Sequence, residues 1–335
     1  MQPPADHPAI PPRRIGVLLT NLGTPNAPEP GAVKLYLREF LSDPRVIEIP
    51  QYVWQPILRG IILNTRPKKS AHAYGQVWTE EGSPLAAITR RQARALQQRL
   101  GDGVVVDHAM RYGKPALRER IQWLKDQGCE RILLAPLYPQ YCAATTATAN
   151  DQAFLQLRHM RWQPAVRTLP PYHDDPAYIA ALQQALEAEL ASLDFAPDAI
   201  IASFHGMPER TLHLGDPYHC QCQKTGRLLS QAMGREILVT FQSRFGRAKW
   251  LEPYTDVTLE ALPGKGVRKV AILAPGFSAD CLETLEELAI RGRESFEGAG
   301  GTHFAYLPCL NDSEPGMNLL ERLVRRELEG WLPAS

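Results

Sequence analysis

The chain has 335 residues, which is long enough for one large domain or two modest ones. It contains 37 lysines and arginines against 36 aspartates and glutamates, and this balance excludes a protein that binds nucleic acid through a general excess of positive charge. No apolar run reaches the ~20 residues that a membrane-spanning helix needs, so an integral membrane protein is also excluded.

The N-terminal segment, residues 1–12, holds five prolines and has neither a basic stretch nor an apolar stretch. We therefore expect a disordered, proline-rich tail there and not a secretory signal peptide. The six cysteines include no C-x-x-C pair. Without a secretion signal they are expected to be reduced thiols, which favours a cytoplasmic location.

Short apolar runs alternate with longer segments of helical period, which is the pattern of a parallel sheet covered by helices. In chain order, the runs predict strands at 14–21, 103–109, 131–136, 199–205, 236–241 and 267–274. The periodic segments predict helices at 88–100, 115–127, 176–193, 224–233, 280–293 and 314–331. Because the strands are apolar throughout, both faces of the sheet are expected to be buried.

Three short segments recur in the same order in the two halves of the chain. Residues 20–25 match 203–208 as [T/S]-x-x-G-x-P, 111–114 match 244–247, and 132–136 match 271–275. The order predicts a duplicated α/β half, with an N-terminal lobe at 13–168 and a C-terminal lobe at 169–313. Because ligands bind outside the carboxyl ends of parallel strands, we expect the site in a cleft between the lobes.

A histidine marks the first difference between the halves. His205 directly follows an apolar run, at the position where the first half has Leu22. A histidine held at a strand end faces the predicted cleft, where it is suited to proton transfer near neutral pH. The alternative is a histidine that only binds a neighbouring backbone group.

Acidic residues mark the second difference, in the predicted helix at 280–293. Glu283 and Glu287 are four residues apart, so their carboxylates share one helix face and together suit cation binding or proton transfer. The alternative makes Asp280 the N-cap of a capping box with Glu283, and makes Glu287 the partner of Arg291 in a surface pair.

The segment at 46–77 is rich in apolar residues and ends in a basic stretch with Arg66, Lys68 and Lys69. It predicts an apolar lip of the cleft for a flat, greasy ligand, with cations nearby for carboxylates or for anionic lipid. The alternative is a buried helix with a solvated basic end.

Four potential metal ligands lie close together at His213, His219, Cys220 and Cys222. The two cysteines are only two positions apart, which is tighter than the spacing of structural zinc sites. Ordinary loop and helix residues are therefore the favoured interpretation.

From residue 14 to about residue 330 the chain resembles the ferrochelatases. The resemblance rests on eight motifs in order: LLTNLGTP (18–25), AYGQVWTEEGSPL (73–85), AMRYGKP (109–115), LYPQYCAATTAT (137–148), SFHGMP (203–208), GDPY (215–218), FQSRFGRAKWLEPYTD (241–256) and PGFSADCLETLEEL (275–288). It implies the chelatase fold, with two flavodoxin- or Rossmann-like lobes that each contain a four-stranded parallel sheet flanked by helices. It also implies insertion of Fe²⁺ into protoporphyrin IX, which gives protoheme and two protons in the last step of heme biosynthesis.

The resemblance assigns roles to individual residues. It implies that His205 is the catalytic residue and Glu283 its acidic partner, both near the metal, with Glu287 and Asp280 on the proton or iron path. The implied porphyrin-binding residues are Arg111, Tyr74, Ser83, Pro84, Tyr141 and Trp250. The last helix, within 314–335, is expected to pack back on the first lobe.

The chain departs from some relatives at its cysteines. Certain ferrochelatases bind a [2Fe–2S] cluster through one internal cysteine and three in a C-terminal extension, which this sequence does not contain. We therefore expect no prosthetic group, with Fe²⁺ as a substrate only. Cys281 stands where many relatives have histidine, so a second family histidine is missing.

Protoporphyrin IX and Fe²⁺ are the expected partners, with no nucleic acid. Peripheral contact with the inner face of the membrane, and handover from the preceding porphyrinogen oxidase, are left open. Three alternatives remain: a ferrochelatase for coproporphyrin, a cobalt chelatase for a sirohydrochlorin-type ring, and a non-catalytic tetrapyrrole or iron carrier. The apolar residues at 46–63 favour protoporphyrin over a ring with eight carboxylates, and a carrier has no need for the histidine and glutamate pair.

Overall fold

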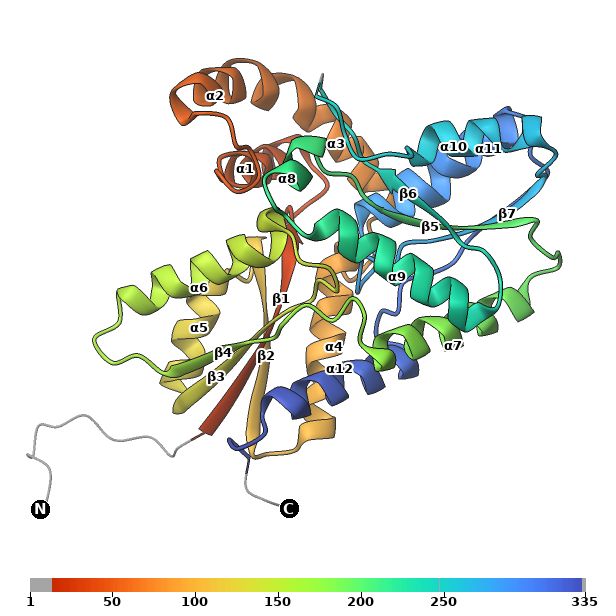
Figure 1. Cartoon of the computed structure of the whole chain (residues 1–335). Coiled ribbons are helices and arrows are strands. Elements are labelled where there is room, and N and C mark those ends of the chain that lie inside the picture. Colours follow the sequence, from red (N-terminus) through yellow and green to blue (C-terminus); the bar gives the residue numbers. More distant parts are fainter. Residues whose placement is uncertain (1–13, 247, 333–335) are drawn as a thin grey trace, which may run out of the picture.

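The computed structural model describes residues 14–246 and 248–332, so the tail predicted at 1–12 lies outside the described residues. Two four-stranded parallel sheets form the centres of two lobes (Figure 1). The strands are β1 (Arg14–Thr24), β2 (Val104–Gly113), β3 (Cys129–Pro136), β4 (Ala165–Thr168), β5 (Ala199–His205), β6 (Leu238–Gln242), β7 (Lys269–Leu273) and β8 (His303–Tyr306). The strand order is β2-β1-β3-β4 in one sheet and β6-β5-β7-β8 in the other. This identical order confirms the predicted pair of similar α/β lobes.

Helices cover both sheets and fill the junction between them (Figure 1). The α-helices are α1 (Pro30–Leu41), α2 (Gln51–Ile57), α3 (Leu63–Val77), α4 (Pro84–Leu100), α5 (Leu117–Asp126), α6 (Thr148–Arg158), α7 (Pro176–Ser192), α8 (Glu209–His213), α9 (Tyr218–Met233), α10 (Thr255–Ala261), α11 (Arg293–Gly298) and α12 (Glu314–Glu327). One 3₁₀ turn, η3, spans Pro263–Lys265. Three π-helical segments are η1 (Leu58–Ile62), η2 (Ala143–Ala147) and η4 (Glu283–Gly292).

The segment predicted as one α-helix at 280–293 differs in the structure. It is the π-helix η4, which continues into α11. Over ten residues the apolar pattern does not separate the α-helical period from the wider π-helical turn, so the sequence could not reveal the difference. The corresponding place in the first lobe, after β3, holds the shorter π-helix η2.

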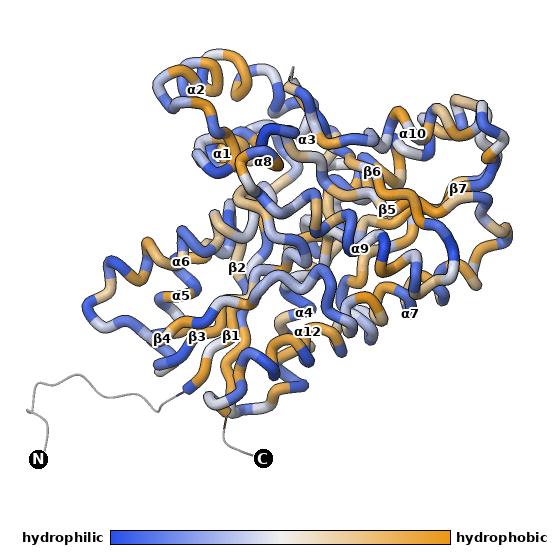
Figure 2. Tube along the Cα trace, in the orientation of Figure 1, coloured by the Kyte–Doolittle hydropathy of each residue, from blue (hydrophilic) through white to orange (hydrophobic). Residues whose placement is uncertain are grey.

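The strands are buried on both faces, as their apolar sequences predict. In β1, Leu18 packs into a cluster with α5 and α6, whereas Val17 and Leu19 join the large core on the opposite face. Figure 2 shows the same hydrophobic continuity along β5, β6 and β7. The two strands that the sequence did not predict, β4 and β8, are four residues long and lie at sheet edges, so they lack a long apolar run.

The two lobes share one core. The large apolar cluster includes Val17 and Leu19 of β1 together with Ile200 and Phe204 of β5. Helix α12 packs against α4, α7 and β3, so it contacts elements of both lobes. Within the described residues, no helix is both long enough and apolar enough to cross a bilayer.

Chain topology gives each lobe one point at which the order of its strands reverses. In each sheet the order of the strands reverses between the central pair, β1 and β3 in one lobe and β5 and β7 in the other. Such reversal points are where doubly wound sheets bind ligands, at the carboxyl ends of the strands. A hydrogen bond of 2.9 Å from Ser278 Oγ, after β7, to the carbonyl of Leu137, after β3, links the two lobes near these points.

Candidate active site

His205 is the last residue of β5, where it pairs in register with Gln242 at the end of β6. Its Nδ1 lies 2.7 Å from the carbonyl oxygen of Gly206. Because a carbonyl oxygen only accepts, Nδ1 carries the proton of this bond and Nε2 is left as the basic nitrogen. The neighbouring backbone group therefore fixes the tautomer that suits a proton acceptor.

Gln242 ties His205 to the acidic helix. Its Nε2 donates to the carbonyl of Glu283 at 2.7 Å, and its Oε1 accepts from Ser203 Oγ at 2.7 Å. Its own carbonyl accepts from the amide of Gly206, also at 2.7 Å. One buried side chain thus sets the first turn of η4 against the strand end that carries His205. Sequence reasoning did not single out Gln242, although it lies within the motif at 241–256.

Glu287 binds the residue that follows Gln242. Its Oε1 accepts from the backbone amide of Ser243 at 2.7 Å, and its Oε2 accepts from the Ser243 hydroxyl. Burial raises the pKa of the Glu287 carboxyl, against the opposing effects of the Ser243 bonds and the nearby charges of His205 and Arg291. A carboxyl with a raised pKa beside a histidine is suited to proton exchange. The predicted Glu287–Arg291 pair is long, at 3.9 Å, whereas Arg291 lies 2.9 Å from Glu286.

Glu283 faces the aromatic side chains of the first lobe. Burial raises the pKa of Tyr74, in α3, well above its usual value, and the charge of Glu283 adds to the rise. Burial and the charges of Tyr74 and Glu283 have the same effect on the pKa of Tyr36, in α1. The charge of Glu283 thus acts on both tyrosines, and α3, which carries Tyr74, packs against η4.

Asp280 belongs to a different set of contacts. Its carboxylate accepts from Asn311 Nδ2 at 2.6 Å, from Thr284 Oγ1 at 2.9 Å and from the Tyr306 hydroxyl. Among the described residues, no backbone amide of η4 donates to it, so the capping-box alternative is wrong. The structure does not bring Asp280 beside His205, and its place on a proton or iron path stays a prediction.

Arg111 is engaged inside the first lobe. Its Nε donates to Thr148 Oγ1 at 2.6 Å and to the Thr148 carbonyl at 3.1 Å, and its Nη2 pairs with Asp43. The guanidinium also stacks on the ring of Tyr112, 4.2 Å from the centroid. The side chain of Arg111 is only 7% exposed, and its partners Thr148 and Asp43 lie within the first lobe. Direct porphyrin binding by Arg111 stays a prediction that the contacts do not support.

The other predicted pocket residues lie around the cleft. Ser83 and Pro84 begin α4, whose next turns pack against Ala279 and Cys281 of the second lobe. Trp250 is paired with Pro208 and donates from Nε1 to the carbonyl of Phe245 at 3.0 Å, so it holds the loop after β6 beside the His205 motif.

Tyr141 precedes η2, and its backbone amide donates to Gln221 at 2.6 Å. Its porphyrin contact also stays a prediction.

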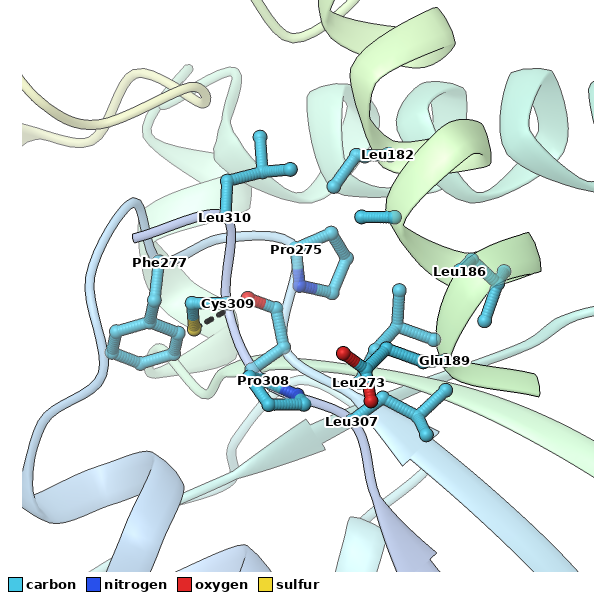
Figure 3. A pocket seen from close by; sticks show the side chains of 12 residues that line it. Leu182, Leu186, Glu189, Leu273, Pro275, Phe277, Leu307, Pro308, Cys309 and Leu310 are labelled. Carbon is cyan, nitrogen blue, oxygen red and sulfur yellow. Dashed lines mark hydrogen bonds between the residues drawn. The ribbon is translucent and has the colours of Figure 1, made fainter. Parts of the chain in front are cut away.

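The described residues contain no cluster of three or more histidine, cysteine or acidic side chains arranged to hold a metal ion. On α9, Cys222 is buried, Cys220 is exposed and His219 stacks on Phe241, so these side chains do not converge. The pocket in Figure 3 lies against α7 and the ends of β7 and β8; its lining is mostly apolar, with Leu182 and Leu307, and does not include His205. The candidate site is therefore the group of polar side chains around His205, at the carboxyl ends of β5 and β6.

Comparison with known proteins identifies the family of the chain. The Ferrochelatase family model matches residues 14–328. Relatives named ferrochelatase include one of Rhizobium etli, 56% identical over 98% of both chains, and one of Rhodopseudomonas palustris, 55% identical over 98% of this chain and 97% of the relative. The solved structure of SirB from Bacillus subtilis with Fe³⁺ has a TM-score of 0.56 at 11% identity, covering 95% of this chain and 98% of SirB.

CbiX, described as the terminal enzyme for siroheme biosynthesis in denitrifying bacteria, has a TM-score of 0.51 at 14% identity, covering 94% of this chain and 99% of CbiX. At such identities these two structures show the shared chelatase fold alone. The family model and the close relatives go further, since together they cover almost the whole chain. The chain therefore belongs to the ferrochelatase family of metal-chelating enzymes.

Proposed function

We propose that this enzyme inserts Fe²⁺ into protoporphyrin IX and releases protoheme and two protons. The observation that carries the proposal is the set of hydrogen bonds made by Gln242, which pairs with His205 in the sheet. Gln242 binds the carbonyl of Glu283 and the amide of Gly206, so it holds the acidic helix η4 next to the strand end that carries His205. Family membership supplies the class of reaction, and this arrangement supplies groups that can perform it.

The reaction needs a proton acceptor because two pyrrole N–H groups must lose their protons before the ring can bind a metal through four nitrogens. His205 accepts these protons at Nε2, and Glu287, whose pKa is raised by burial, receives them next. Glu283 offers a carboxylate near the same edge for the incoming ion. Oxygen and nitrogen ligands of this kind hold Fe²⁺ loosely enough to release it to the ring.

The lip formed by α2, η1 and α3 suits the apolar porphyrin. Its outer surface exposes large apolar side chains, with Tyr52 83% and Ile61 57% exposed. Arg66 lies 5.3 Å from the ring centroid of Phe245, a residue of the second lobe. Burial lowers the pKa of Arg66, and no carboxylate among the described residues pairs with it. We propose that this guanidinium receives a propionate of the substrate.

The same exposed surface supports peripheral membrane contact, through which a porphyrinogen oxidase could hand over its product. The same lip carries the exposed cations Arg59, on η1, and Lys68, on α3, and exposed apolar and basic side chains on one surface are the combination that binds anionic lipid. Flotation with vesicles containing phosphatidylglycerol tests this proposal. Wild-type protein is expected to float with the vesicles, and a Tyr52→Ser, Ile61→Ser variant is expected to stay in the bottom fraction. Equal flotation of both proteins would show that these side chains of the lip do not bind the membrane.

The test of the proposed reaction is loss of porphyrin fluorescence with anaerobic Fe²⁺. Wild-type protein should consume protoporphyrin IX, and His205→Ala should abolish insertion while still binding the porphyrin. His213→Ala, an exposed histidine on α8, is the matched control and should retain the wild-type rate.

Preference for coproporphyrin, cobalt insertion into sirohydrochlorin, or binding without insertion would each identify one of the alternatives. Normal turnover by His205→Ala would remove His205 from the mechanism.

A further inference from the structure

The loop between β8 and α12 reaches the start of η4 through Asn311. The side-chain amide of Asn311 binds Asp280 twice, because Nδ2 donates to the carboxylate at 2.6 Å and Oδ1 accepts from the backbone amide at 2.8 Å. Asn311 has a φ of +51°, a conformation that asparagine tolerates better than most residues. The side-chain amide of Asn311 thus binds one residue, Asp280, which lies shortly before η4.

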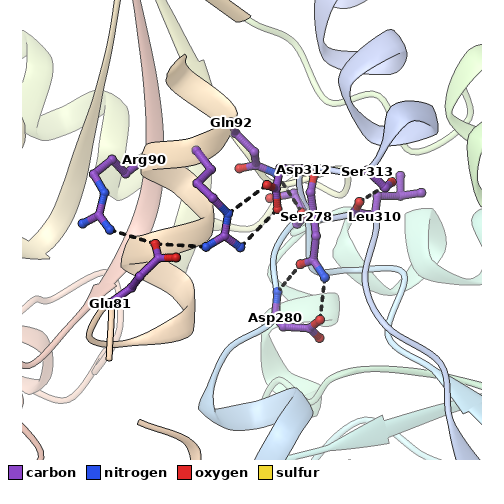
Figure 4. Close-up of polar contacts among 10 residues, drawn as sticks. Glu81, Arg90, Gln92, Ser278, Asp280, Leu310, Asp312 and Ser313 are labelled. Carbon is purple, nitrogen blue, oxygen red and sulfur yellow. Dashed lines mark hydrogen bonds and ion pairs between the residues drawn. The ribbon is translucent and has the colours of Figure 1, made fainter. Parts of the chain in front are cut away.

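The first lobe holds the same loop. Gln92 of α4 is buried, and its Nε2 donates to the carbonyls of Asn311 at 2.8 Å and of Ser278 at 3.1 Å. Next to it, Arg91 pairs with Asp312 at 2.8 Å (Figure 4). Both ends of the Asn311–Asp280 contact are therefore tied to a helix of the opposite lobe.

The contact continues into η4. Asp280 accepts from the hydroxyl of Thr284, which in turn accepts from the amide of Cys281 at 3.0 Å. Thr284 directly follows Glu283, whose carbonyl is held from the other side by Gln242. The first backbone N–H groups of a helix lack intrahelical acceptors, so side-chain contacts such as these help to fix its first turn.

We propose that Asn311 and Gln92 are positioning residues that fix the first turn of η4, and with it Glu283, relative to the first lobe. Asp280 serves as the link: it anchors the helix and does not carry protons or iron. The inference rests on the proposed function for the role of Glu283. It predicts that kcat depends on the hydrogen bonds between residues 280 and 311. It also predicts that kcat does not depend on which of these two residues carries the negative charge.

The first test is Asn311→Gly, which removes the amide at a backbone angle that glycine adopts without strain. We expect kcat for iron insertion to fall about 10-fold with little change in the porphyrin KM, because a displaced group outside the substrate contact lowers the rate more than binding. Amide hydrogen exchange over 283–287 should become faster. Asn318→Ala, which removes an exposed amide of α12 that binds only Arg99 among the described residues, is the matched control and should leave kcat and exchange unchanged.

The second test exchanges the two side chains. In the double variant Asp280→Asn, Asn311→Asp every hydrogen bond of the contact can form again, with the charge moved to the loop. We expect it to recover most of the wild-type kcat and exchange protection. A swap no better than Asn311→Gly would overturn the inference, because it would show that the charge of Asp280 itself is required.

A third measurement separates positioning from general stability. In a Glu283→Gln background, Asn311→Gly should lower the residual rate less than twofold, since the residue that it positions is already lost. A full additional 10-fold loss, or a wild-type kcat and wild-type exchange for Asn311→Gly alone, would overturn the inference. Failure of the proposed function is distinct, because wild-type protein would then insert no iron while exchange over 283–287 still reported the anchor.

Discussion

The buried pair of Arg111 and Asp43 gives a sharp prediction for Asp43→Asn. Asp43 Oδ2 accepts from Arg111, from the Tyr112 hydroxyl at 2.8 Å and from Thr148, and Oδ1 accepts from the amide of Arg45 at 2.7 Å. Every neighbour is a donor. An asparagine amide therefore turns its own donor toward one of them in either orientation, and it leaves the arginine charge without a partner.

The magnitude follows from burial. The side chains of Arg111 and Asp43 are 7% and 6% exposed, so little solvent screens the pair. Removing one partner of such a pair costs about 3–5 kcal/mol of unfolding free energy. Asp43→Asn, Arg111→Met should cost less than Asp43→Asn alone, because it removes the unpaired charge as well.

The pH dependence has a definite sign. Burial alone would raise the pKa of Asp43, but hydrogen bonds from Thr148, Arg45 and Tyr112 and the charge of Arg111 lower it overall from its ordinary 3.8. The stabilisation is thus fully present above pH 3.8 and is lost as pH falls through the lower, folded-state pKa.

Urea denaturation at pH 7, followed by circular dichroism, measures the cost. Asp151→Asn is the control, since its pair with Arg45 spans 2.8 Å but both side chains are 44–47% exposed, and it should cost less than about 1 kcal/mol. A cost of less than about 1 kcal/mol for Asp43→Asn, or a larger cost for the double variant, would refute the reasoning. Unchanged porphyrin affinity in the double variant would also show that Arg111 does not bind the ring.

Three further predictions concern the cleft. Glu287→Gln should gain stability relative to wild type as pH rises above the ordinary carboxyl pKa of 4.5, because burial raises the pKa of Glu287 and ionising it costs folding energy; denaturation at pH 5 and pH 8 should show a difference that grows with pH. Gly206→Ala should fold with a stability loss of about 1–3 kcal/mol and a slower insertion rate, because the added Cβ would lie 2.6 Å from the Gln242 carbonyl; an unchanged rate would mean that the strand end tolerates the shift. Iodoacetamide should modify exposed Cys220 in the native protein and spare Cys281, whose thiol pKa is raised by burial; mass spectrometry of the labelled peptides checks this, and rapid labelling of Cys281 would contradict it.

The sequence predicts the sheet well where burial is two-sided. The run at 199–205 is apolar up to His205, and β5 has the same bounds. Strand β8 at His303–Tyr306 escapes prediction because it is short and begins with an exposed histidine. Edge strands are defined by pairing with a neighbour, which no local pattern records.

The candidate site divides in a similar way. Comparing the two halves singles out His205 and Glu283, because titratable side chains stand out against neutral counterparts. Gln242 and Asn311 escape notice because a neutral amide acquires its role only when the fold sets it beside particular partners. Arg111 is the opposite case, because the sequence makes it look like a cation that is free to bind a ligand. In the fold it pairs with Asp43, which is 68 positions away in the sequence.

Helix α12 ties the two lobes together at one end of the molecule. It crosses the junction at the end of the molecule opposite the lip (Figure 1), with Arg99 bound to Glu314 and Glu321, and Arg326 bound to Asp175. Separating the lobes at that end would break these pairs and expose the shared core. Next to the lip, Arg210 pairs with Glu48 across the lobes. Their side chains are 56% and 35% exposed, so breaking this pair costs little free energy. Any separation of the lobes is therefore expected to begin at the end that carries the lip, with α12 as the fixed end.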